Sequence, residues 1–401
     1  MTDTTTAADR AAGSTPMSIA LVGTRGVPAR YGGFETCVEE VGHRLADRGH
    51  RVVVYCRDAT SETPLDQRPT SYRGMELVHK PAMRKRSLET LSHTALSAAH
   101  LFGHRTDAAI VFNSANAPFL PILRAARIPF ATHVDGLEWQ RGKWGGTGKR
   151  YYQLAERASV WWSDALIADA QGISDYYRQK FDADTELIAY GAPIVSDASD
   201  RLHELDLTSR GYHLVVARFE PENHVHLIVE GYTASSATKP LIVVGSAPYA
   251  DEYTARLHAL ADDRVRFLGG VWDQELLDQL YANGLTYLHG HSVGGTNPSL
   301  LRALGAAAAT TAFDVVFNRE VLGDSGRYFA SADDVRRLVE EAEADPDATR
   351  SRGAAALRRA DLYTWDDVAD RYETLCRNLR KSRDDRARRA SHPRELQKQP
   401  S

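Results

Sequence analysis

The rest of the chain is organised around HGHSVGGTNPSLLRALG, which runs from His289 to Gly305. It follows an apolar, strand-like run and turns through two glycines and Pro298 into a helix with apolar periodicity. A strand, a Gly-rich turn and a helix N-terminus in this order gather backbone N–H groups and the positive end of a helix dipole. Such a corner suits an anionic group such as a diphosphate. An ordinary strand-to-helix turn is the alternative, because one Gly-rich turn is a weak signal.

The same alternation of apolar strands and helices runs through nearly the whole chain. In the first half, strand patterns cover residues 17–23, 51–56, 108–112, 129–133, 165–168 and 186–189. In the second half they cover residues 212–217, 241–244, 265–268, 285–288 and 308–312, and only helices follow Ala330. This pattern predicts an α/β protein with two Rossmann-like, doubly wound domains that face each other across a cleft.

Changes in composition divide the chain into segments. The N-terminal segment lacks periodicity and is expected to be disordered, and a polar linker separates the two series of strands. After the second domain we expect a last helix that packs back across the domain boundary, followed by a basic disordered tail. The expected segments are residues 1–16, 17–195, 196–210, 211–360, 361–379 and 380–401.

The composition is that of a soluble globular protein. Of the 401 residues, 43% are hydrophobic and 25% are charged, and no apolar run approaches the ~20 residues that span a bilayer. The N-terminus has no signal-peptide pattern, so the sequence predicts a cytoplasmic protein. Cys37, Cys56 and Cys376 lack metal-ligand spacing and are expected to be buried or inert thiols.

Basic charge gathers at the C-terminus. From Arg377 onward there are nine Lys and Arg residues against three acids, although the whole chain has a net charge of −4. Such a tail suits anionic lipid headgroups, where each basic residue contributes ~1 kcal/mol, and a solvated end is the alternative. The basic run Lys80–Arg86 before a helix suggests a peripheral contact with the inner face of the cell membrane, or a plain surface helix. No nucleic-acid partner is expected.

The first Gly-rich loop does not have the spacing of a dinucleotide site. Gly23 and Gly26 are three residues apart, and the pair Gly32 and Gly33 comes only at the start of the next helix. Arg57 follows the second strand, where a dinucleotide site would have an acidic residue for the ribose. A nicotinamide-dependent oxidoreductase is therefore disfavoured. The paired glycines still permit close approach of a phosphate or a sugar, with a tight turn as the alternative.

Ionisable and aromatic side chains follow the strand at residues 129–133. An acid and a histidine at the edge of a cleft are candidates for catalysis, although a histidine at a strand end is equally often structural. The candidate catalytic residues are His133, Asp135 and Glu138. The candidate acceptor contacts are Trp139, which suits stacking on a sugar, and Arg141 and Lys143, which suit a phosphate. The alternative is that the basic residues are simply exposed to solvent at the start of a helix.

Arg218 follows the first strand of the second domain and suits a charge-assisted contact with a diphosphate. The alternative is an ion pair with Glu220 or Glu222. Asp182 and Asp184 have the spacing of a metal-binding DxD motif, but they lie in a polar turn, so no metal site is predicted.

The chain resembles a known group, the GT-B glycosyltransferases of family 4, and within it the bacterial rhamnosyltransferase-like branch. The resemblance covers about residues 18–379. Its most specific carriers are GTRGVPARYGGFET (Gly23–Thr36), KRSLETLSH (Lys85–His93), VDGLEW (Val134–Trp139), ARFEPEN (Ala217–Asn223), HGHSVGGTNPSLL, and FNREVLGD (Phe317–Asp324).

The resemblance implies a nucleotide diphosphate sugar as donor, bound chiefly by the C-terminal domain, and transfer that retains configuration without a metal or other cofactor. It implies that the N-terminal domain takes the acceptor, a lipid-linked saccharide of surface polysaccharide, and that the sugar is rhamnose or another hexose. His133 or Asp135 would border the reacting sugar, residues 297–300 would offer backbone donors, and Glu320 would lie near the donor sugar or ribose. Carried over by position, the donor contacts are Gly32, Gly33, Arg218, Gly294, Gly295, Thr296, Asn297, Pro298, Ser299, Leu300, Arg302 and Glu320.

This chain departs from the family's pattern around the same helix. Family members commonly have two glutamates where this chain has Gly294 and Arg302. A glutamate at position 302 would accept hydrogen bonds from ribose hydroxyls, whereas arginine has no acceptor to offer. The lysine that often partners the diphosphate-binding arginine is also absent, since Glu222, Asn223 and His224 stand in that region. Two functions therefore stay open, a retaining glycosyltransferase and a non-catalytic relative that binds or scaffolds.

Overall fold

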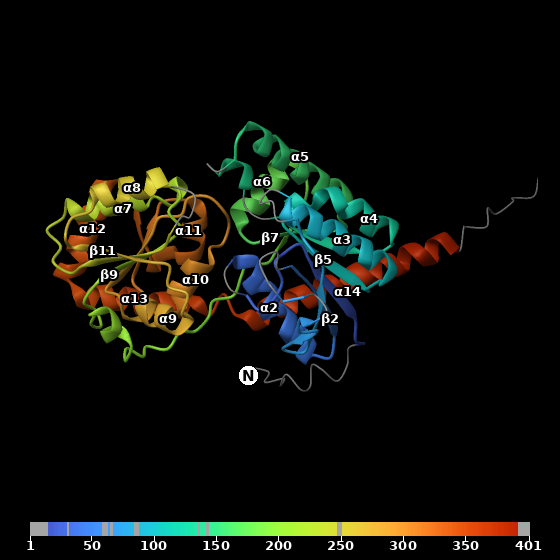
Figure 1. Ribbon diagram of the computed structural model, residues 1–401, viewed down its shortest axis with the longest axis horizontal. Helices are drawn as coiled ribbons and strands as arrows, with labels where there is room; N and C mark the ends of the chain where they lie inside the picture. Colours follow the sequence, from blue (N-terminus) through green and yellow to red (C-terminus); the bar gives the residue numbers. More distant parts are fainter. Residues whose placement is uncertain are drawn as a thin grey trace, which may run out of the picture.

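The computed structural model describes residues 15–29, 32–57, 63–64, 67–83, 88–134, 137–141, 144–246 and 251–391. Two α/β domains lie side by side, each built on one sheet with helices on both faces (Figure 1). The fold class predicted from the alternation of strands and helices is confirmed.

The N-terminal domain contains an eight-stranded sheet in the order β3-β4-β2-β1-β5-β6-β7-β8. Its strands are β1 (Ser18–Val22), β2 (Arg51–Cys56), β3 (Ser71–Tyr72), β4 (Met75–His79), β5 (Ala108–Phe112), β6 (Phe130–Val134), β7 (Ala165–Ala168) and β8 (Glu186–Leu187). Its helices are α2 (Gly33–Asp47), α3 (Glu89–Gly103), α4 (Leu120–Ala125), α5 (Gly146–Trp162) and α6 (Gln171–Phe181). The chain changes direction between β1 and β5, which makes the carboxyl ends of these strands the expected place for a ligand.

The C-terminal domain contains a parallel six-stranded sheet in the order β11-β10-β9-β12-β13-β14. Its strands are β9 (His213–Val216), β10 (Leu241–Val244), β11 (Val265–Gly269), β12 (Thr286–His289), β13 (Thr310–Phe313) and β14 (Arg327–Phe329). Its helices are α7 (Val225–Thr233), α8 (Asp251–Leu260), α9 (Gln274–Asn283), α10 (Pro298–Gly305), α11 (Val316–Leu322), α12 (Ala332–Ala344) and α13 (Pro346–Ala360). Here the order reverses between β9 and β12, so the Gly-rich stretch after β12 leaves the sheet at its switch point.

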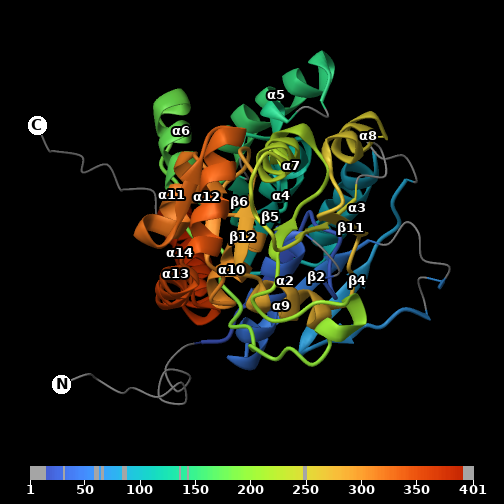
Figure 2. The same cartoon turned by 90° about the vertical axis from the view of Figure 1, so that its left-hand side faces the viewer.

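Helices cover both faces of each sheet, and this explains why the strands are apolar throughout. In the C-terminal domain, α7, α8 and α12 pack on one face while α9, α10 and α13 pack on the other, as the end-on view in Figure 2 also shows. All five residues of β5 are buried, which is typical of a parallel strand with a helix layer on each side.

The hairpin of β3 and β4 is the antiparallel pair of the N-terminal sheet, and the sequence pattern did not predict it. β3 has only two residues and neither is buried. A strand this short carries no periodicity that a sequence pattern can detect.

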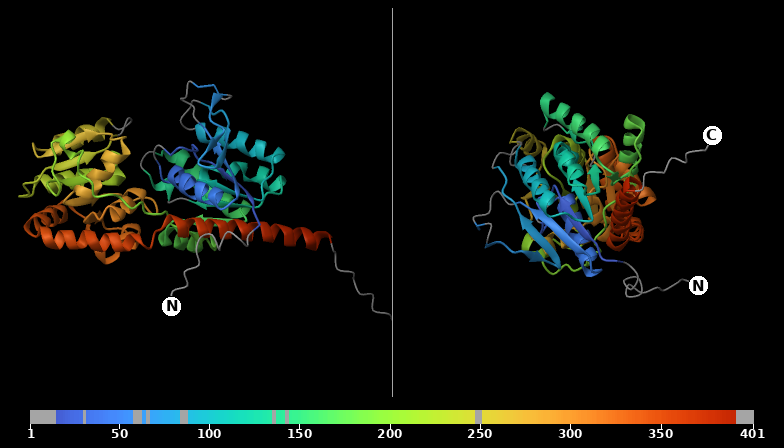
Figure 3. Two further views of the ribbon diagram at one scale, coloured as in Figure 1. Left: turned by 90° about the horizontal axis from the view of Figure 1, so that it is seen from below. Right: turned by 90° about the vertical axis from the view of Figure 1, so that its right-hand side faces the viewer.

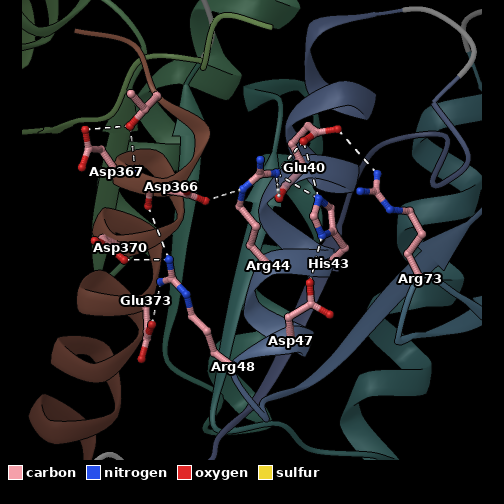
Figure 4. Close-up of polar contacts among 11 residues, drawn as sticks. Glu40, His43, Arg44, Asp47, Arg48, Arg73, Asp366, Asp367, Asp370 and Glu373 are labelled. Carbon is pink, nitrogen blue, oxygen red and sulfur yellow. Dashed lines mark hydrogen bonds and ion pairs between the residues drawn. The ribbon is translucent and has the colours of Figure 1, made fainter. Parts of the chain in front are cut away.

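The last helix, α14 (Trp365–Ser391), returns from the C-terminal domain and lies along the N-terminal domain (Figure 3). Arg44 Nε of α2 lies 2.8 Å from Asp366 Oδ1. Arg48, at the end of α2, pairs with Asp370 at 2.7 Å and with Glu373 at 2.8 Å (Figure 4). These ion pairs flank the buried contact between Cys37 and Tyr372, and together they fasten α14 to α2.

The helix extends further than the sequence predicted. We expected it to end at Leu379 and residues 380–401 to be a disordered tail, but α14 continues to Ser391. Arg383 lies 3.7 Å from Asp107, and Arg386 lies 2.9 Å from Asp164. These contacts with the edge of the N-terminal domain support the added turns. The expected tails at residues 1–14 and 392–401 lie outside the described residues.

The polar segment at residues 196–210 is packed on the C-terminal domain. Leu202 and Leu207 are buried, and Arg201 N donates to the side chain of Gln279 on α9 (2.9 Å). Asn283 Nδ2 donates to Ala198 O in the same region (2.8 Å). The segment therefore follows the surface of α9 although its sequence has no continuous apolar face.

Candidate functional site

The loops at the carboxyl ends of the two sheets meet between the domains, where α10 and α11 face α2 and α6 (Figure 1). A Cβ on Gly33 would lie only 2.9 Å from Pro298 Cγ, so the start of α2 nearly touches the start of α10. Thr296 Oγ1 donates to the backbone oxygen of Asp169, which follows β7 (2.5 Å). The predicted sites at Gly32–Gly33 and at the Gly-rich stretch are thus neighbours at the boundary between the two domains.

The Gly-rich stretch between β12 and α10 is held by Asn318 of α11 and by the backbone of Glu222. Asn318 Nδ2 donates to His291 O (2.9 Å), and Ser292 N donates to Glu222 O (3.0 Å). The backbone N–H groups of Gly294 and Gly295 donate to no residue that the structure describes. Gly294 has a φ of +130°, which side-chain-bearing residues rarely adopt. Two adjacent backbone donors are therefore held in place at the mouth of the cleft.

The N-terminus of α10 itself offers fewer donors than we expected from residues 297–300. Asn297 Oδ1 accepts from Ser299 N (2.9 Å), and Asn297 O accepts from Leu300 N (3.0 Å). Pro298 has no N–H to give, and the side chain of Leu300 is buried. The N–H groups of Ser299 and Leu300 are used within the helix end, because asparagine is a strong N-cap residue, so the role expected of residues 297–300 stays a prediction. The donors available to an anion lie one turn earlier, in the glycines.

Two arginines approach this loop from opposite domains. The Arg218 side chain is 58% exposed and lies 3.5 Å from Glu220, so the ion pair considered as an alternative is present but loose. Arg141 Nη2 comes within 4.0 Å of where a Cβ on Gly294 would stand. Burial, together with the charges of His289, Arg218 and Arg141, holds the pKa of His291 well below its ordinary value. Arg141, predicted as a contact for the acceptor, therefore lies beside Gly294, which was predicted as a contact for the donor sugar nucleotide.

His133 lies behind the wall of the cleft and not on its surface. Its ring is 0% exposed, stacks near Phe112 and Tyr190 at centroid distances of 5.6 and 5.8 Å, and meets the edge of Phe34 at 5.1 Å. Burial lowers the pKa of His133 to about 3, so the imidazole is neutral. Neither ring nitrogen has a hydrogen-bond partner among the described residues. In this arrangement the imidazole of His133 is buried among aromatic rings, and its part in catalysis stays a prediction.

The other candidates near His133 have definite partners or lie outside the described residues. Asp135 and Lys143 belong to the latter group. The Glu138 carboxylate is 2.5 Å from Arg141 Nε and accepts from Trp144 Nε1 (3.2 Å). Trp139 lies under the Lys180 ammonium of α6, 5.5 Å from the ring centroid. Glu138 thus serves to hold Arg141, and Trp139 packs on α6 rather than presenting both faces to a sugar.

Asp169 is a buried carboxyl at the cleft that the sequence analysis missed. It is 3% exposed, directly follows β7, and one of its oxygens touches Gly295, where a Cβ would collide with it. Burial raises the pKa of Asp169 to about 7. Its Oδ1 has no hydrogen-bond partner among the described residues. An acidic residue directly after the predicted strand 165–168 was the signal that could have identified it.

Glu320 also joins the domains, but its carboxylate does not face open space. Oε1 and Oε2 accept from Gln171 N at 2.8 and 3.0 Å, so Glu320 of α11 caps the N-terminus of α6. A carboxylate is favoured there by the helix dipole. The side chain expected near the donor sugar or ribose is instead engaged with the other domain.

Arg302 forms an ion pair with Asp278 of α9 and is half-buried. Its charge is therefore matched locally, and the guanidinium does not point unpaired into the cleft. Asp278 also accepts from Gln274 Nε2 (3.1 Å). The position that departs most from the family's pattern has thus become part of the contact between α9 and α10.

The DxD-like pair has an ordinary structural role. Asp182 ends α6 in the left-handed conformation, and Asp184 lies 2.9 Å from Arg178. Over the described part of the chain, no three His, Cys, Asp or Glu side chains are grouped as metal ligands. The three cysteines are free and buried, as predicted.

One part of the chain is similar to a known protein family. Residues 32–191 match the family model of the glycosyl transferase 4-like domain. This domain begins at the glycine pair before α2 and ends beyond β8, so it spans most of the N-terminal sheet. No significant match is found among curated proteins. Among the described helices, none combines the length and the apolar character needed to cross a membrane.

Solved structures extend the likeness over both domains. Anabaena HepE in complex with UDP-glucose has 17% identity and a TM-score of 0.72, covering 90% of this chain and 99% of that chain. Sucrose-phosphate synthase from Thermosynechococcus elongatus has 18% identity and a TM-score of 0.78, covering 91% and 99%. WaaG, a glycosyltransferase involved in lipopolysaccharide biosynthesis, has 16% identity and a TM-score of 0.67, covering 88% and 98%. The chain therefore has the GT-B glycosyltransferase fold, and residues 32–191 of its N-terminal domain are similar to the glycosyl transferase 4-like domain.

Proposed function

We propose that the chain is a retaining glycosyltransferase that moves a hexose or deoxyhexose, such as rhamnose, from a nucleotide diphosphate sugar to a lipid-linked saccharide. The reaction belongs to bacterial surface polysaccharide biosynthesis, takes place at the cytoplasmic face of the membrane and requires no metal. One observation carries the proposal: Gly294 and Gly295 present two adjacent backbone donors beside Arg218, at the switch point of the C-terminal sheet.

This arrangement suits the charge that develops when a nucleotide diphosphate leaves the sugar. Backbone donors and a guanidinium that are already in place stabilise that charge without reorganising in the transition state. Because Gly33 has no Cβ, the start of α2 lies close to Pro298, which brings the two glycine-rich loops together beside the proposed donor. The presence of UDP-glucose in HepE, which shares the fold, supports a nucleotide sugar as donor.

Exposed aromatic side chains support a membrane-bound acceptor. Phe102 at the end of α3 is 50% exposed, and Trp161 at the end of α5 is 70% exposed. α14 places Arg383 and Arg386 beside the loops that follow these two helices. Aromatic rings and basic side chains at one edge suit the headgroup region of an anionic membrane. In a flotation assay, Trp161→Ala with Phe102→Ala should weaken binding to vesicles that contain anionic lipid.

The decisive experiment incubates the purified protein with a panel of nucleotide sugars and a polyprenyl-diphosphate-linked monosaccharide. Formation of a disaccharide with the donor's anomeric configuration, by nuclear magnetic resonance, would support the proposal, and a parallel reaction with a chelator tests metal independence. Absence of both transfer and donor binding would sink it. Donor binding without transfer would favour a non-catalytic binding subunit. The Arg302–Asp278 ion pair supports this second function, because Arg302 stands where a glutamate would accept hydrogen bonds from the ribose.

A further inference from the structure

Arg141 belongs to the N-terminal domain but lies at the glycines of the C-terminal domain. Its Nη2 comes within 4.0 Å of the Cβ position of Gly294, and its charge acts on His291 together with that of Arg218. The side chain is 19% exposed, so it lies between the domains and not out in solvent. Two guanidinium groups from two domains therefore converge on one backbone loop.

Arg141 is held in this place by the residues just before and after it. The short 3-10 helix Glu138–Gln140 follows β6 and brings Glu138 back onto Arg141 Nε at 2.5 Å. Glu138 is 8% exposed and is fixed further by the indole N–H of Trp144. The ion pair with Glu138 limits the positions that the Arg141 guanidinium can take. This arrangement resembles the support that positions a ligand-binding side chain, and it differs from a freely rotating surface arginine.

The C-terminal domain alone provides little positive charge for a diphosphate. Between β9 and α7, residues 217–224 include Arg218 and no lysine, and Glu220 already lies 3.5 Å from Arg218. His291 does not help as a cation, because burial and the nearby charges keep its ring neutral. A nucleoside diphosphate carries more than one negative charge, so a second cation is needed for neutralisation.

We propose that Arg141 is this second cation and binds the donor diphosphate jointly with Arg218. The inference rests on the proposed function and deepens it, because it assigns to the donor a residue of the acceptor domain. Since each arginine comes from a different domain, a diphosphate bound by both favours the arrangement in which the domains are in contact. Binding of the nucleotide then helps to assemble the cleft.

The test compares nucleotide binding to wild-type protein, Arg141→Gln and Arg336→Gln. Arg336 lies on α12 and is paired with Asp333 at 3.5 Å, so it is a matched arginine remote from the cleft. Calorimetry uses uridine and thymidine diphosphates and the corresponding monophosphates. We expect Arg141→Gln to weaken diphosphate binding about 10-fold and monophosphate binding less than about 2-fold, and Arg336→Gln to change neither.

A structural readout separates ligand binding from a merely supporting role. In hydrogen exchange, a diphosphate should protect the peptides at residues 137–141 and 290–297 together in the wild-type protein. Arg141→Gln should lose protection at 137–141 and keep it at 290–297. Circular dichroism and thermal melting establish that the variant is folded.

The possible failures are distinguishable. Equal diphosphate affinity of wild-type protein and Arg141→Gln, or a change confined to the KM of the acceptor, would overturn this inference and leave the glycosyltransferase standing. A wild-type protein that binds no nucleotide or nucleotide sugar would overturn the proposed function and this inference with it.

Discussion

Replacing Asp169 by asparagine should stabilise the protein above neutral pH and remove a pH dependence that this carboxyl creates. Burial raises the pKa of Asp169 from 3.8 to about 7. Glu320 of α11, Cys37 of α2 and Tyr372 of α14 interact with its charge, and none of these three residues is a cation. Between pH 3.8 and about 7 the folded protein holds a proton that the unfolded chain has released. Stability therefore falls as pH rises through this window and levels off above it.

The size of the effect follows from the shift. Each pKa unit corresponds to ~1.4 kcal/mol, so the ionised carboxyl costs the folded state roughly 4 kcal/mol when fully deprotonated. Between about pH 5 and about pH 8, the wild-type protein should lose about 2.5 kcal/mol relative to Asp169→Asn, whose amide stays neutral.

Urea unfolding followed by tryptophan fluorescence measures this difference at the two pH values. Because other groups titrate in the same range, the quantity to compare is wild type minus variant at each pH. Asp263→Asn, at an exposed position, is the matched control and should show no such change. A difference between wild type and Asp169→Asn that is the same at both pH values would refute the reasoning.

Three further variants test other contacts. The double variant Arg302→Glu with Asp278→Arg reverses the charges of this ion pair and should keep the stability of the protein. In calorimetry it should bind uridine or thymidine diphosphate more tightly. Unchanged affinity would contradict the contact expected between position 302 and the ribose. Glu373→Gln should lower the free energy of unfolding by about 1–3 kcal/mol near neutral pH. Burial raises the pKa of Glu373, but hydrogen bonds from its cationic partners outweigh burial and lower the pKa to about 2. Urea titrations should therefore find that the stability contributed by Glu373 is lost in acid as pH falls toward that value. Asn297→Ala should cost about 1 kcal/mol through loss of the N-cap, measured by urea unfolding, while the control Ser351→Ala on the exposed side of α13 should cost less.

The alternation of strands and helices was enough to predict most of both sheets, because buried parallel strands are apolar along their whole length. It did not predict β3, β4 or β14. The strands Arg51–Cys56, Ala108–Phe112, Ala165–Ala168 and Leu241–Val244 lie where the pattern placed them. The end of α14 was not predictable in the same way. Arg383 and Arg386 read as a solvated tail in sequence, and only the fold brings Asp107 and Asp164 beside them.

The candidate site was predictable as a location but not as a set of contacts. The Gly-rich stretch and the pair Gly32–Gly33 were expected to face each other, and they do. The partner of each charged side chain depends on residues distant in sequence. Glu320 binds the start of α6, 149 residues away, and Arg141 reaches the other domain's loop. Such pairings leave no spacing or periodicity in the sequence from which to infer them.

The return of α14 means that the two domains are joined by two pieces of chain. The outgoing piece near Ala192 and the returning piece near Tyr363 lie side by side, since Ala192 N donates to Tyr363 O (2.6 Å). Next to them, Gly191 leaves room for the ring of Trp365. Two adjacent crossings act as a hinge with an axis, whereas a single linker would allow the domains to swivel freely. A protease cut at one crossing would therefore leave the two halves of the molecule still attached to each other.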